Sequence, residues 1–130
     1  MTTVNYSKHK GFSGAPPRPL GNGVLHGPTG ATPVIRCVVD TGADLLQLPA
    51  SYASAVGISL TGLAPTSART AGGRARLIRV AGLTVDVEGV PATVDVLFDP
   101  TNGQGLLGRN ALAALQEVGV NLVINEWLWH

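Results

Sequence analysis

The stretch that decides the fold is Val38-Val39-Asp40-Thr41-Gly42-Ala43-Asp44, in which an acid directly follows two bulky apolar residues. The valines close an apolar run that begins at Val34 and is interrupted only by Arg36. A run of this kind, bounded by Pro33 before it and by a glycine turn after it, predicts a buried strand. The strand would hold the Asp40 carboxylate rigidly and partly desolvated, and Gly42 would let the chain turn close to a ligand. An acid–base catalyst needs both properties.

A second motif supports this interpretation, because Asp-Thr-Gly alone also fits an ordinary strand-to-turn junction. The second motif is Leu106-Leu107-Gly108-Arg109-Asn110-Ala111-Leu112, far downstream of Asp40. Its apolar pair and glycine are followed, after Arg109, by residues 110–118, whose apolar spacing predicts a helix. We expect Asn110 to cap the start of this helix and Gly119 to end it.

The residues between the two motifs alternate in the manner of β-strands. Thr70-Ala71-Gly72-Gly73 is a strong turn signal, and it predicts a hairpin with a glycine tip over residues 67–76. Alternation at 83–87 and 93–98 predicts a second hairpin around Glu88-Gly89. Further short strands are predicted at 45–48, 58–63 and 120–124, and a single helical turn at 52–56. The sequence therefore predicts an all-β fold with one short C-terminal helix, and not a doubly wound α/β sheet.

Composition narrows the classes of function. The 130 residues fit one domain, and a hydrophobic content of 45% with 13% charged residues allows a real core. A formal charge of +1 argues against binding of nucleic acid or a membrane surface by bulk electrostatics. Residues 1–20 are polar and rich in Gly and Pro, so we expect a flexible N-terminal arm there and a folded domain over 21–130. We find no membrane-spanning run and no signal peptide, and expect a cytoplasmic protein by default.

No cofactor and no metal are expected. The chain has one cysteine, which rules out an internal disulfide framework and a cysteine-based zinc site. Cys37 lies in the apolar run before Asp40, where a buried thiol is more common than a reactive one. His9, His26 and His130 are scattered and show no metal-ligand spacing.

The order of these features resembles the retropepsins, the single-domain aspartic proteases of retroviruses and their bacterial relatives. The resemblance extends over about residues 34–124 and includes Asp-Thr-Gly-Ala at 40–43, the glycine-tipped hairpin and Gly-Arg-Asn at 108–110. It implies a retropepsin-like β-barrel, closed or partly open, with a flap hairpin and one short C-terminal helix. Pepsin-like enzymes carry two copies of the first motif on one chain. The single copy here implies a homodimer that acts on peptide or protein substrates.

Dimerisation also follows from acid–base chemistry. One aspartate cannot act as base towards water and as acid towards the amide, but two Asp40 side chains facing each other across a twofold axis can. Two carboxylates about 3 Å apart repel by roughly 5 kcal/mol at an effective dielectric of about 20, so one of them stays protonated through mildly acidic pH. We therefore expect peptide hydrolysis by a water activated between two Asp40 carboxylates, without an acyl-enzyme.

The resemblance assigns roles to other residues as well. Thr41 would hydrogen-bond across the dimer interface, and Gly42 would let the substrate backbone pass close by. Asp44 would pair with Arg109, next to Gly108, and orient the active-site loop; solvated surface charges are the alternative. The substrate-binding or flap positions would be Ala43, Asp44, Ala71, Gly72, Gly73 and Arg74, although an ordinary hairpin turn also fits the last four.

Two other functions compete with the protease. Residues 103–108 match the dinucleotide-binding pattern G-x-G-x-x-G, but only residues 109–130 follow, too few for the βαβ unit of about 30 residues or more that this pattern opens. The more serious alternative is a non-catalytic retropepsin-like dimer that binds an extended peptide. The intact Asp40-Thr41-Gly42 favours the protease, because a binding module does not need a buried pair of carboxylates.

Overall fold

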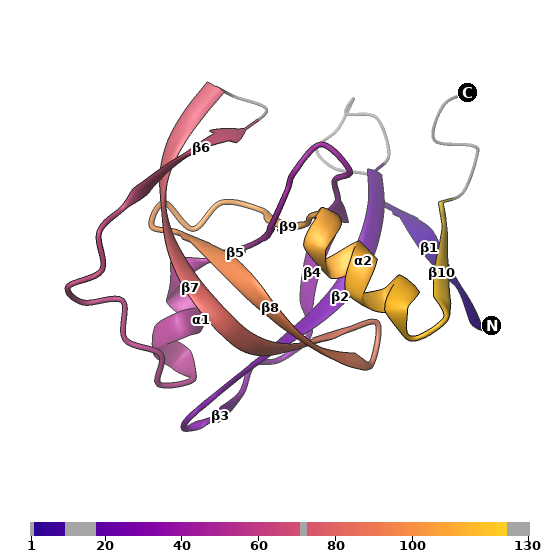
Figure 1. The fold of residues 1–130 in the computed structure, drawn as a ribbon, viewed down its shortest axis with the longest axis horizontal. Coiled ribbons are helices and arrows are strands. Elements are labelled where there is room, and N and C mark those ends of the chain that lie inside the picture. Colours follow the sequence, from indigo (N-terminus) through magenta and orange to yellow (C-terminus); the bar gives the residue numbers. More distant parts are fainter. Residues whose placement is uncertain (1, 10–17, 71–72, 125–130) are drawn as a thin grey trace.

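The computed structural model of the chain describes residues 2–9, 18–70 and 73–124, with side chains described for 20–67 and 75–120. This part of the chain is mostly β with two short helices (Figure 1). Its elements are, in chain order, β1 (Thr2–His9), β2 (Arg18–Gly27), β3 (Gly30–Ala31), β4 (Ile35–Val39), β5 (Leu46–Pro49), α1 (Ala50–Ala55), β6 (Thr66–Thr70), β7 (Gly73–Val87), β8 (Val90–Asp99), β9 (Gly105–Leu107), α2 (Arg109–Glu117) and β10 (Val120–Ile124).

Six of these strands close into a barrel. The strands β2, β4, β9, β5, β8 and β7 are neighbours in this order, and β7 pairs back onto β2. The pairs β4–β9 and β5–β8 are parallel, whereas β2–β4, β5–β9, β7–β8 and β2–β7 are antiparallel. Closure removes the free edges of these strands. The predicted all-β barrel is confirmed.

Alternating residues of the strands fill the barrel interior. In β4, Ile35, Cys37 and Val39 are buried and Arg36 is exposed. Phe98 of β8 is the largest fully buried side chain, and burying an apolar side chain of this size contributes about 1.5–3 kcal/mol. The predicted burial of the Cys37 thiol is confirmed, and this burial raises its pKa to about 12.

The helix α2 packs one face against the barrel. Its buried residues, Ala111 and Leu115, are one turn apart. The helix ends before Gly119, whose φ of 80° confirms the predicted stop. The prediction that Asn110 caps its start is wrong, because Gly108 is the N-cap and the Asn110 side chain bonds elsewhere. Neither helix in the described ranges is long and apolar enough to cross a membrane.

Two predicted strands differ from the structure. The segment 58–63 is irregular, and none of the described strands pairs with it. The two predicted hairpins share a single strand, because β7 runs for 15 residues. Its first part pairs with β6 and its remainder with β8, with an irregularity in register between Val80 and Leu83. One strand therefore forms both the barrel wall and the hairpin above it (Figure 1).

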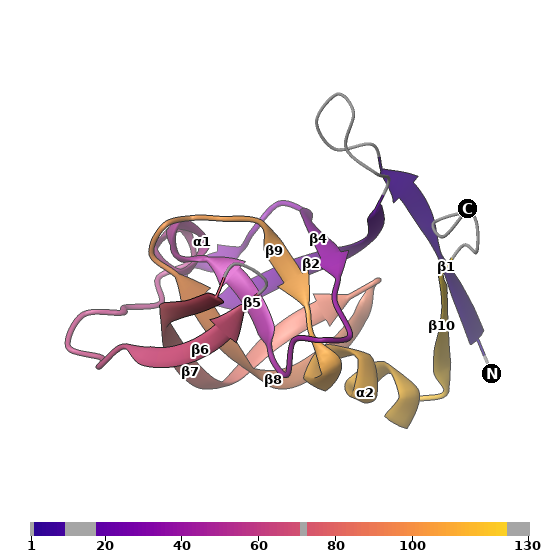
Figure 2. The ribbon, with the colours of Figure 1, turned by 90° about the horizontal axis from the view of Figure 1, so that it is seen from above.

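The described N-terminal residues also form a strand. Residues 2–9 make up β1, which pairs in parallel with β10 and antiparallel with β2. Figure 2 shows β1 and β10 side by side at one end of the molecule, beyond the barrel. Sequence reasoning predicted no strand within residues 1–20, and the boundary between arm and domain at residue 20 stays a prediction.

Candidate active site

The Asp40 carboxylate lies directly after β4 and is fixed by its own turn. The backbone N–H of Asp40 donates to the carbonyl oxygen of Leu107 in the neighbouring β9, at 3.0 Å. The side-chain Oδ1 accepts a hydrogen bond from the N–H of Gly42 at 2.9 Å. A Cβ on Gly42 would lie 3.2 Å from that oxygen, a tight contact that glycine avoids. The result is a half-buried carboxylate with a defined direction at the end of a buried strand.

Gly108 lets the second motif pack directly against the active-site loop, residues 40–45. A Cβ on Gly108 would lie 2.4 Å from the carbonyl oxygen of Leu45 and 2.9 Å from that of Ala43. The N–H of Arg109 donates to the Ala43 oxygen at 2.8 Å, and the N–H of Asn110 donates to the Asp44 oxygen at 3.0 Å. The first N–H groups of a helix have no partner within the helix. Here the active-site loop satisfies them, so α2 holds the loop in place.

An ion pair joins the same two segments. Arg109 Nη2 donates to Asp44 Oδ1, as predicted from the sequence. The side chains are 65% and 77% exposed, and exposed pairs contribute only about 0–1 kcal/mol to stability. The pair therefore contributes little to the stability of the fold, and its role in orienting the loop, like the part of Asp44 in substrate binding, stays a prediction.

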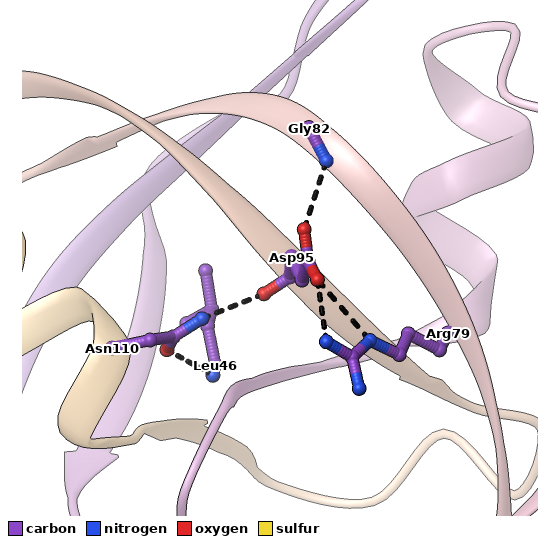
Figure 3. Close-up of polar contacts among 5 residues, drawn as sticks. All are labelled: Leu46, Arg79, Gly82, Asp95 and Asn110. Atoms are coloured by element: carbon purple, nitrogen blue, oxygen red, sulfur yellow. Dashed lines mark hydrogen bonds and ion pairs between the residues drawn. The ribbon is translucent and has the colours of Figure 1, made fainter.

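Sequence reasoning missed a polar network behind the loop (Figure 3). Asn110 Oδ1 accepts from the N–H of Leu46 at 2.7 Å, and Asn110 Nδ2 donates to the carbonyl oxygen of Asp95 at 2.9 Å. The Asp95 carboxylate in turn accepts hydrogen bonds from the Arg79 side chain and from the N–H of Gly82. These two partners, Arg79 foremost, hold the pKa of Asp95 below its usual range. In the sequence Asp95 is only one polar residue of an alternating strand, so no local signal marks it.

A pocket of about 400 Å³ opens beside the active-site loop. It is lined by loop residues, by two residues of β6, by the outward face of the barrel and by the first residue of α2: Gly42, Ala43, Asp44, Leu45, Gln47, Thr66, Ser67, Arg79, Leu97 and Arg109. Two hollows of about 430 and 540 Å³ are lined by no residue of the loop, so their size alone does not make them sites. The 400 Å³ pocket is lined by four residues of the active-site loop, whereas a further hollow of about 340 Å³ is lined by only one of them, Leu45.

The predicted flap is described only in part. The strands β6 and β7 pair from Thr66 with Leu77 to Thr70 with Gly73, which confirms a hairpin. Ala71 and Gly72 lie outside the described residues. Gly73 opens β7, and Arg74 pairs in register with Arg69, but the side chains there are not described. The role of this hairpin as a flap stays a prediction.

The structure brings together the loop residues of the first motif and Gly108 and Arg109 of the second, with the base of the hairpin across a shared pocket. A comparison with protein families matches residues 29–114 to gag-polyprotein putative aspartyl protease. A comparison with curated proteins gives no match. The matched segment covers more than half of the chain and contains both motifs and every barrel strand except β2. The chain therefore belongs to the retroviral-type aspartyl protease family that gag polyproteins carry.

Proposed function

We propose that the chain is an aspartic endopeptidase that is active as a homodimer. The observation that carries this proposal is the single Asp-Thr-Gly loop, which ends β4 with its carboxylate oriented by the N–H of Gly42. One such carboxylate provides one acid–base group, whereas peptide hydrolysis by this chemistry uses two. A second copy of the chain, related by a twofold axis, supplies the other.

The proposed reaction proceeds through a water molecule held between the two Asp40 carboxylates, one ionised and one protonated. The ionised carboxylate takes a proton from the water while the oxygen atom of that water attacks the peptide carbonyl carbon. The protonated carboxylate gives its proton to the carbonyl oxygen, which yields a tetrahedral diol. The first carboxylate then protonates the amide nitrogen, the C–N bond breaks, and the second takes a proton from the diol. One proton is left on the pair, as at the start.

The contacts around the loop support this proposal because the reaction is sensitive to position. A displacement of about 1 Å at the reacting groups can cost a factor of about 100 in rate. Gly108 and Arg109 hold the chain directly after Asp40, and Asn110 holds Leu46, where β5 begins. Thr41 is exposed beside Asp40, where it would meet the partner subunit. The β6–β7 hairpin would close over the peptide as a flap and exclude water.

The test compares wild type with Asp40→Asn on a diverse peptide mixture between about pH 4 and 7, with products identified by mass spectrometry. We expect wild type to cut and Asp40→Asn to be slower by at least about 100-fold, the lower range for loss of an acid–base group. Glu117→Gln, the same chemical change on an exposed residue of α2, should cut like wild type.

Dilution tests the dimer. The rate per mole of chain should fall on dilution in parallel with dissociation measured by sedimentation. A constant rate per mole in samples that sediment as monomers would contradict the dimer. If wild type and Asp40→Asn both form folded dimers that bind peptides without cutting them, the result would contradict the peptidase and favour a peptide-binding module.

A further inference from the structure

The floor of the 400 Å³ pocket is a row of side chains in register across neighbouring strands. Gln47 of β5 lies opposite Leu106 of β9 and opposite Leu97 of β8, and Leu97 lies opposite Arg79 of β7. Residues opposite each other on paired strands point to the same face of a sheet. Leu48, the next residue of β5, is buried in the core, so the row faces outward. Gln47, Leu97 and Arg79 all line the pocket.

The guanidinium of Arg79 is held in one orientation. Asp95, two residues before Leu97 on the same face, accepts hydrogen bonds from Arg79 Nε at 3.2 Å and Nη2 at 2.6 Å through Oδ2. The other carboxylate oxygen accepts from the N–H of Gly82 at 3.1 Å, in the irregular part of β7. The third nitrogen, Nη1, points away from Asp95 (Figure 3). A guanidinium fixed on two of its nitrogens presents the third as an oriented donor.

The pocket combines this donor with little net charge. Arg79 is paired with Asp95, and Arg109 with Asp44. Leu97 gives the floor an apolar patch, and Gln47 and Thr66 add polar groups to the lining. A ligand would therefore be selected by a hydrogen bond to an oriented group and not by bulk attraction of charge.

We propose that Arg79, held by Asp95, determines specificity at this pocket and selects a substrate side chain that ends in a carboxylate or amide oxygen. The inference rests on the proposed peptidase function. The methylene groups of Glu or Gln lie over Leu97, and the terminal oxygen accepts from Arg79 Nη1. An aliphatic side chain makes no such bond, and a lysine brings a like charge. Asp95 acts through Arg79 and is a positioning residue.

The experiment uses peptides that differ only in having Glu, Gln, Leu or Lys at each position around the cleaved bond in turn. For wild type we expect one position at which Glu and Gln raise kcat/KM about tenfold over Leu, as one hydrogen bond to a charged group would do, with Lys slowest. Arg79→Leu should bring the Glu/Leu and Gln/Leu ratios close to one. Arg36→Leu removes an arginine from the exposed face of β4, outside the pocket, and should keep the wild-type ratios.

Asp95→Asn separates positioning from a purely structural role. Without the ion pair the guanidinium loses its fixed orientation, so the Gln/Leu ratio should fall. The charge of Arg79 is then no longer balanced, so the Glu/Gln ratio should rise. A structural role alone would lower kcat/KM for all peptides by the same factor and leave both ratios unchanged, which would overturn the positioning role.

Binding of the same peptides to Asp40→Asn, followed by fluorescence anisotropy, distinguishes failure of this inference from failure of the proposed function. Glu and Gln peptides could bind more tightly than Leu peptides in a manner that depends on Arg79, while wild type cleaves none of them. This result would contradict the proposed peptidase function and support the assignment of Arg79. Cleavage or binding that does not distinguish Glu and Gln from Leu, or that is unchanged in Arg79→Leu, overturns the assignment. Absence of both cleavage and binding overturns both proposals.

Discussion

Replacing Gly108 with alanine should push the active-site loop out of place without unfolding the protein. The φ of −83° at Gly108 is open to alanine, so the cost comes only from contacts. The added Cβ would lie 2.4 Å from the Leu45 carbonyl oxygen, where ordinary contact begins at 3.4 Å. The two backbones must therefore part by about 1 Å, because neither contains a flexible side chain that can yield.

A separation of that size would stretch the bonds from the N–H groups of Arg109 and Asn110, now 2.8 and 3.0 Å long, past hydrogen-bonding range. Two lost hydrogen bonds at about 1 kcal/mol each, with residual strain, give a loss of about 2–4 kcal/mol in free energy of unfolding. The free energy of unfolding of typical domains is about 5–15 kcal/mol, so the variant should stay folded. A shift of about 1 Å at Asp40 should reduce kcat/KM by about 100-fold.

Urea denaturation at equal protein concentration measures the first effect. With a slope of about 2 kcal/mol/M, the midpoint should fall by about 1–2 M. Gly23→Ala is the matched control, because Gly23, which lies in β2, is buried like Gly108 but its Cβ would meet nothing closer than 3.9 Å. A Gly108→Ala protein as stable and as active as Gly23→Ala would refute the packing argument.

Two further predictions concern Asp99, the last residue of β8, and Asn110 of α2. Burial acts to raise the pKa of Asp99, but hydrogen bonds from Thr101 and from the N–H of Gly103 outweigh it and hold the pKa below the usual range. The ionised carboxylate therefore stabilises the fold above about pH 4, and this stabilisation is lost as the pH falls through the lower pKa of Asp99 in the folded state. In Asp99→Asn the free energy of unfolding, measured with urea at several pH values, should therefore decrease less at acid pH than in wild type. Asn110→Ala leaves two backbone groups without their partner and should cost about 1–3 kcal/mol by the same assay, whereas Asn110→Asp keeps the acceptor and should recover part of the loss. A full loss in Asn110→Asp would contradict the role given to the acceptor.

The features that were predictable from sequence are those encoded by neighbouring residues. The apolar run before Asp40 and the alternation in β8 indicate buried and half-buried strands, and Gly119 ends α2 where a positive φ is needed. The pair of Asp44 and Arg109, by contrast, was predicted from the resemblance to the retropepsins, and the structure contains that pair.

The features that were missed depend on partners far along the chain. The strand β1 contains only two apolar residues, Val4 and Tyr6, and it pairs with β10 at the other end of the sequence as well as with β2. The two parts of β7 were predicted as strands of separate hairpins, whereas in the structure the strand is continuous and Asp95 on the neighbouring strand accepts a hydrogen bond from the N–H of Gly82 within the irregular part. Asn110 matched a helix cap by type, but its amide reaches β5 and β8 instead.

The burial of the chain's single thiol offers a natural reporter beside the active site. Cys37 lies three residues before Asp40, and a Cβ on Gly105 of the adjacent β9 would meet its sulfur at 2.9 Å. With a pKa of about 12 the sulfur is almost entirely a thiol at neutral pH and reacts slowly. Alkylation therefore requires β4 to separate from its neighbouring strands. The rate of alkylation then measures the free energy of this local opening. The measurement needs no introduced label and works at concentrations low enough to dissociate a dimer. It would show whether assembly, or a bound peptide, closes the barrel at the strand that precedes Asp40.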